Sequence, residues 1–90
     1  MSSIDSSLKR ANILILEDLI FYQEAITALL KKHQFSGQLS YATQLKDAQL
    51  ILESKSIQLL ITDLHLPDGL SIELVKKLDL VKQSVLYQFC

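Results

Sequence analysis

An apolar run that ends at a carboxylate constrains this sequence more than any other feature. Residues 57 to 61 read Ile-Gln-Leu-Leu-Ile, a pattern typical of a short strand buried on both faces of a parallel sheet. Asp63 follows this run, and Pro67 and Gly69 predict a loop before a helix over Leu70 to Leu80. Asp63 is therefore expected where a strand ends, which is the edge at which open α/β sheets bind ligands.

Three other stretches also predict strands. Asn12 to Leu16 is a second continuous apolar run with β-branched residues. Gln38 to Ala42 alternates polar and apolar residues, as a half-exposed edge strand does. Val85 to Phe89 predicts a fourth strand near the end of the sequence.

Apolar stripes predict a helix between each pair of strands. The first helix is expected over Leu19 to His33, and Thr43 is a good N-cap for the second. The stripes consist of Leu19, Tyr22, Ile26, Leu29 and Leu30 in the first helix, of Leu45, Ala48 and Leu52 in the second, and of Leu74, Val75 and Leu78 in the third.

The resulting order of elements is β-α-β-α-β-α-β with short connections. This order predicts an α/β fold with a doubly wound parallel sheet. The flavodoxin-like version is truncated here to four strands, with the spatial order 2-1-3-4.

Composition limits the possible functions. The 90 residues suffice for one domain, and 49% hydrophobic with 21% charged residues indicate a packed globular chain. We expect a flexible tail over residues 1–10 and the domain over residues 11–90. The formal net charge of -1 gives no basic footprint for nucleic acid or for an anionic membrane surface, and no apolar run reaches the length of a membrane helix. The single cysteine, Cys90, cannot form an internal disulfide, which favours a cytoplasmic location.

Three acidic residues are expected to meet at one edge of this sheet. Glu17 and Asp18 follow the first strand and Asp63 follows the third, and these strands are neighbours in the expected order. Close carboxylates repel one another unless a cation lies among them, and an oxygen-rich site of this kind suits Mg²⁺. A carboxylate beside such an ion is a plausible attacking group in phosphoryl transfer. The alternative is that each acid forms a turn or caps a helix.

Two stretches of the sequence resemble the receiver domains of two-component response regulators. The first is Ile-Leu-Ile-Leu-Glu-Asp over residues 13–18, and the second is Leu-Ile-Thr-Asp-Leu-His-Leu-Pro-Asp-Gly over residues 60–69. The Ala42-Thr43 start of the second helix and its Ala48 are also similar to the family. The resemblance extends from about Ala11 to the end of the sequence.

The resemblance implies a magnesium-dependent phosphoacceptor. Asp63 would take a phosphoryl group from a phosphohistidine on a sensor histidine kinase or a phosphotransfer protein. Asp18 and Asp63 would bind Mg²⁺ directly, Glu17 would bind it through water, and the backbone carbonyl of His65 would complete the protein ligands.

The sequence also departs from the family pattern. Receiver domains carry a Ser or Thr after a fourth strand and a Lys after a fifth, whereas the Ser/Thr position here falls near Phe89 or Cys90 and no fifth strand follows. A degenerate interaction module that does not switch by phosphorylation is therefore a second hypothesis. A Mg²⁺-dependent phosphatase is a third, disfavoured because His65 stands where such enzymes place a second acid. We thus expect no enzymatic activity beyond autocatalytic acceptance of phosphate.

The predicted fourth strand would have an uncovered outer edge. Unpaired N–H and C=O groups on such an edge favour association. The sequence therefore predicts a homodimer formed through residues 84–90, by edge pairing or by exchange of this segment.

Overall fold

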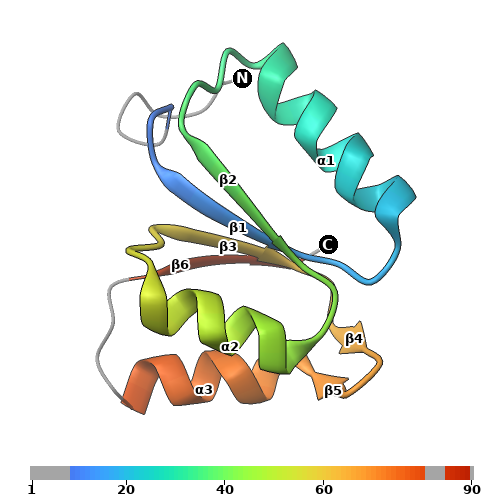
Figure 1. The fold of residues 1–90 in the computed structure, drawn as a ribbon, viewed down its shortest axis with the longest axis vertical. Helices are drawn as coiled ribbons and strands as arrows, with labels where there is room; N and C mark the ends of the chain where they lie inside the picture. Colours follow the sequence, from blue (N-terminus) through green and yellow to red (C-terminus); the bar gives the residue numbers. More distant parts are fainter. Residues whose placement is uncertain (1–8, 81–84, 90) are drawn as a thin grey trace.

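The sheet has four parallel strands in the order β2-β1-β3-β6, as Figure 1 shows. The computed structural model describes residues 9–80 and 85–89. The strands are β1 (Asn12–Leu16), β2 (Gln38–Ala42), β3 (Leu59–Thr62) and β6 (Leu86–Phe89). The expected flavodoxin-like order 2-1-3-4 is therefore confirmed, with β6 as its fourth strand. Most of the predicted tail, and Cys90, lie outside the described residues.

In the described part of the chain, three helices connect the strands and cover both faces of the sheet. The helix α1 (Ile20–Lys32) lies on one face, whereas α2 (Leu45–Ser54) and α3 (Ser71–Leu80) lie on the other (Figure 1). The loop after β3 contains a short antiparallel hairpin, β4 (His65–Leu66) and β5 (Gly69–Leu70), which the sequence did not predict. No helix in these described segments is long and apolar enough to cross a membrane.

The two faces of β1 build two separate cores. Leu14 and Leu16 belong to the cluster under α2 and α3, while Ile13 and Ile15 belong to the cluster on the α1 side. This division follows from the alternation of side chains along a strand. All four side chains are at most 1% exposed, so β1 is deeply buried on both of its faces.

The predicted apolar stripe of α1 is partly wrong. Leu19, Tyr22 and Leu29 are more than half exposed, whereas Ile26 and Leu30 pack against the sheet. The buried residue of this helix is Gln23. Residues 23, 26 and 30 have the i, i+3, i+7 spacing of one helical face, and a glutamine occupies its first position. A search for apolar residues therefore misses the first position of the buried face and adds exposed residues to it.

The predicted N-cap of α2 is also wrong. The helix begins at Leu45, so Gln44 and not Thr43 is the residue before its first turn. The Gln44 side chain makes no capping hydrogen bond. The first N–H groups of α2 need another acceptor, which the loop after β3 supplies as described below.

Candidate functional site

The pairing of β1 with β3 brings the three acidic residues together. The last pair in the register is Leu16 with Thr62, and the Asp63 N–H donates to the Leu16 carbonyl over 3.1 Å. The strands β1 and β3 therefore end at the same level of the sheet. Because parallel strands end at one edge, Glu17, Asp18 and Asp63 all follow these strands on the same side.

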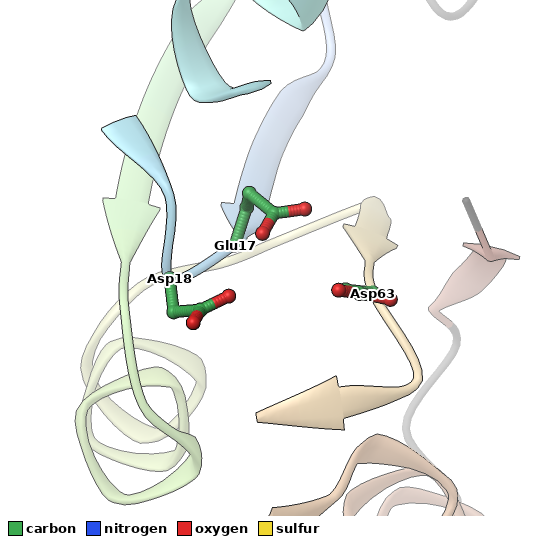
Figure 2. Close-up of side chains that lie close together, drawn as sticks. All are labelled: Glu17, Asp18 and Asp63. Carbon is green, nitrogen blue, oxygen red and sulfur yellow. The ribbon is translucent and has the colours of Figure 1, made fainter. Parts of the chain in front are cut away.

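The carboxylates of Glu17, Asp18 and Asp63 face a common space (Figure 2). One oxygen from each lies within 4.8 Å of the others. Glu17 is buried, whereas Asp18 and Asp63 reach solvent. The structure thus brings together all three side chains that the sequence predicted for this site.

Hydrogen bonds with the backbone orient two of these carboxylates. Leu64 donates its N–H to Asp63 Oδ1 over 2.8 Å, and Leu19 donates its N–H to Glu17 Oε2 over 3.3 Å. Thr62, which is fully buried, donates its hydroxyl to the Asp63 carbonyl over 2.7 Å. The carboxyl group of Asp63 is therefore held against the start of its own loop.

Burial and crowding disfavour the charge of Glu17. Removal from water is the largest cause that raises the pKa of the Glu17 carboxyl above its ordinary value, and the nearby Asp18 and Asp63 carboxyls raise it as well. The N–H of Leu19 acts in the opposite direction and lowers this pKa. A cation among the three groups would remove the repulsion, and their oxygen-only donor set fits a hard ion such as Mg²⁺.

The hairpin after Asp63 ties the site to the start of α2. Asp68 accepts the Leu45 N–H over 2.8 Å and the Lys46 N–H over 3.1 Å, so it caps a helix that begins 23 residues earlier. These bonds lower the pKa of Asp68, with the Leu45 N–H as the main cause. The hairpin turns over Pro67 and Asp68, and Gly69, the first residue of β5, has a φ of 141°, which favours glycine.

His65 lies in the same hairpin, two residues after Asp63, with an exposed side chain. An exposed imidazole agrees with the expectation that only the backbone of His65 serves the site. Its role as a carbonyl ligand stays a prediction.

Sequence reasoning missed two polar side chains near the site. One is Asp68, which caps α2, and the other is Gln23, whose amide group donates to the Glu17 carbonyl over 2.8 Å. Pro67 and Gly69 predicted a loop around Asp68, and nothing in the sequence indicated a partner in a distant helix. Gln23 was hidden because the helical stripe was sought among apolar residues.

Comparisons with known proteins agree with this fold. No protein-family model matches the sequence, and no curated protein matches it significantly. A solved structure of the MaeR response regulator bound to beryllium trifluoride is 32% identical, with a TM-score of 0.85 over 89% of this chain. An Asp-to-Ala mutant of the MaeR response regulator bound to sulfate is 31% identical, with a TM-score of 0.85 over 90% of this chain.

These similarities establish the class of the protein. The chain belongs to the receiver domains of response regulators, as the motifs over residues 13–18 and 60–69 predicted. It spans 66% of the length of each MaeR chain that it matches.

Replacing Glu17 by Gln should stabilise the metal-free protein at neutral pH. The pKa of Glu17 is raised on folding, so its ionised form opposes folding, and the wild type should gain stability as pH falls from neutrality toward the ordinary carboxyl value of 4.5. The advantage of Glu17→Gln should shrink over the same range. Urea unfolding in metal-free buffer at several pH values measures this. Glu24→Gln, an exposed change on α1, should show no such trend. Equal stability of Glu17→Gln and wild type at neutral pH would contradict the inference that the ionised Glu17 carboxylate opposes folding.

Replacing Asp68 by Ala should loosen the first turn of α2. We expect faster hydrogen exchange at the Leu45 and Lys46 amides, whereas Asp68→Asn should keep most of their protection because Asn is also a good cap. The pKa of Asp68 is lowered on folding, so the ionised carboxylate stabilises the folded state. This stabilisation is complete above the ordinary pKa of 3.8 and is lost as pH falls through the lower pKa of the folded state. The low-pH loss of protection should be absent in Asp68→Ala. Unchanged exchange in that variant would show that the cap is unimportant.

Proposed function

We propose that this receiver domain is a phosphoacceptor module of a two-component phosphorelay, with Asp63 as the acceptor and Mg²⁺ as its cofactor. One observation carries the proposal. The Asp63 carboxylate lies within 4.8 Å of two further carboxylates in a chain that belongs to the response-regulator family. Three acids so close together are costly without a cation, and a cation beside a carboxylate is what phosphoryl transfer to that carboxylate needs.

The ligand roles follow the positions of the acids. Asp18 and Asp63, which reach solvent, would hold Mg²⁺ directly, and the buried Glu17 would hold it through water. The backbone carbonyl of His65 is the fourth protein ligand in this proposal. Bound there, Mg²⁺ would supply positive charge that offsets the acids and the phosphoryl oxygens.

The proposed step transfers one phosphoryl group to Asp63. Oδ1 of Asp63 accepts the Leu64 N–H, and Oδ2 is the oxygen that we assign as the nucleophile. An electron pair of this oxygen forms a bond to phosphorus while the P–N bond of the partner's phosphohistidine breaks. The imidazole keeps the electron pair of that bond, and an aspartyl phosphate results. The similar MaeR structures hold beryllium trifluoride and sulfate, both small anions, which agrees with a phosphoryl group as the ligand.

The partners and location follow from this role. A sensor histidine kinase or a phosphotransfer protein would donate the phosphoryl group in the cytoplasm, without nucleic acid or a membrane surface as a partner of this domain. The domain would perform no separate enzymatic reaction. A magnesium-dependent phosphatase is disfavoured because His65 stands two residues after Asp63, where such enzymes usually place a second acidic residue.

Phosphorylation should occur on Asp63 alone. Incubation with a small phosphodonor and Mg²⁺ should add one phosphoryl group to the wild type, and Asp63→Asn should show no addition because its amide is not a nucleophile. Intact mass spectrometry measures the gain. Asp47→Asn, a change of another aspartate in α2, should be phosphorylated like the wild type. No gain in the wild type, under conditions that label another receiver domain, would favour the degenerate interaction module instead.

The outer edge of β6 supports the proposed homodimer. Within residues 9–80 and 85–89, β6 pairs only with β3, so its other edge carries N–H and C=O groups without a strand partner. A second copy could pair with this edge through residues 84–90, of which 84 and 90 lie outside the described residues. Sedimentation at tens of micromolar should therefore detect a dimer whose fraction rises with concentration. A monomer across that range would contradict the proposal.

A further inference from the structure

A buried glutamine of α1 reaches the backbone of the acidic pair. Gln23 is 7% exposed, although the helix offers many solvent-facing positions for a polar residue. Its Nε2 donates to the Glu17 carbonyl over 2.8 Å and approaches the Ala42 carbonyl at 3.4 Å. One side chain of α1 therefore contacts the ends of both β1 and β2.

The Glu17 carbonyl lies just beyond the last paired position of the sheet. The register of β1 with β2 ends at Leu16 and Ala42, and the Glu17 N–H still donates to the Ala42 carbonyl over 3.0 Å. Beyond that point the chain after β2 turns toward α2, which begins at Leu45. The Gln23 amide supplies the donor that a longer β2 would have supplied. A buried carbonyl without a donor disfavours folding, because it has lost its hydrogen bonds to water.

We propose that Gln23 is a positioning residue of the acidic site. Its amide fixes the peptide between Glu17 and Asp18, and the plane of this peptide sets the direction in which the Asp18 carboxylate leaves the chain. The inference rests on the proposed function, since it assigns to Gln23 an effect on Mg²⁺ binding by Asp18 and Asp63.

Packing alone does not explain a glutamine at this position. Residues 23, 26 and 30 share the face of α1 that meets the sheet, and the other two are Ile26 and Leu30. An apolar side chain would fill the same space and bury more apolar surface, which favours folding. The backbone of Gln23 is held as well, because Thr27 Oγ1 donates to its carbonyl over 2.9 Å and lies 2.8 Å from the Tyr41 hydroxyl.

The test replaces the amide and keeps the shape of the side chain. Gln23→Met should weaken Mg²⁺ binding roughly three- to tenfold, the equilibrium equivalent of one lost hydrogen bond. The Asp18 amide signal in the NMR spectrum of the metal-free protein should shift, because the peptide that contains it loses its partner. Calorimetric titration with Mg²⁺ and the amide spectrum are recorded well below the melting temperature of each variant.

Two controls separate positioning from loss of stability. Gln49→Met makes the same exchange on α2 and removes a side-chain hydrogen bond to Glu53, away from the acidic site. Ile57→Val removes a buried methylene from the far end of the sheet and lowers the free energy of unfolding without touching the site. Both controls should bind Mg²⁺ as the wild type does.

The outcomes separate this inference from the proposed function. An unshifted Asp18 amide or unchanged Mg²⁺ affinity in Gln23→Met would overturn the role of Gln23, as would equal weakening in Ile57→Val. A wild-type protein that binds no Mg²⁺ would overturn the proposed function. In that case the Asp18 amide shift still decides whether Gln23 fixes the peptide.

Discussion

The parallel pairing of β1 with β3 is the contact on which the acidic site depends. It places Leu16 opposite Thr62, and the acids begin one residue later on each strand. A slip of one residue would turn every side chain of a strand to the opposite face, and β1 is buried on both of its faces. Its residues Ile13 and Ile15 pack on the α1 side, while Leu14 and Leu16 pack under α2 and α3. The core therefore fixes the distance between the acids, and the site needs no contact of its own to bring β1 and β3 together.

Beyond the last paired residues of the sheet, polar side chains supply the hydrogen bonds that neighbouring strands supply within it. Backbone groups that leave a ladder still require partners. At the end of β1 the amide of Gln23 bonds to the Glu17 carbonyl, and after β3 the carboxylate of Asp68 bonds to the first N–H groups of α2. Each of these side chains lies on an element other than the one that it holds. The loops with the acids are thereby connected by hydrogen bonds to α1 and α2.

Apolar pattern predicted the sheet well because burial determines where strands form. The runs before Glu17 and Asp63 became β1 and β3, and strand order placed their acids together as expected. The same reasoning predicted α1 itself but failed for part of its buried face and for the cap of α2. Gln23 is buried with its amide bonded to the Glu17 and Ala42 carbonyls, and Asp68 caps α2 because the hairpin folds toward that helix. Neither contact follows from local spacing, since both depend on the tertiary position of a distant carbonyl or N–H. Leu19, Tyr22 and Leu29 were wrongly assigned to the core because the apolar spacing alone does not show which face of α1 meets the sheet.

The acids also connect ligand binding to folding. The raised pKa of Glu17 means that the folded chain holds this carboxylate at a cost, within a domain whose two cores are small. Proteins of this size have only several kcal/mol of net stability, so one buried charge is a considerable fraction of it. A ligand that binds only the folded state adds stability in proportion to the logarithm of its concentration above its dissociation constant. A cation at this site would add this binding free energy to the stability of the fold, and it would also relieve the repulsion that raises the pKa of Glu17. The sheet edge with the acids should therefore be the part of the molecule whose stability responds most to divalent cations.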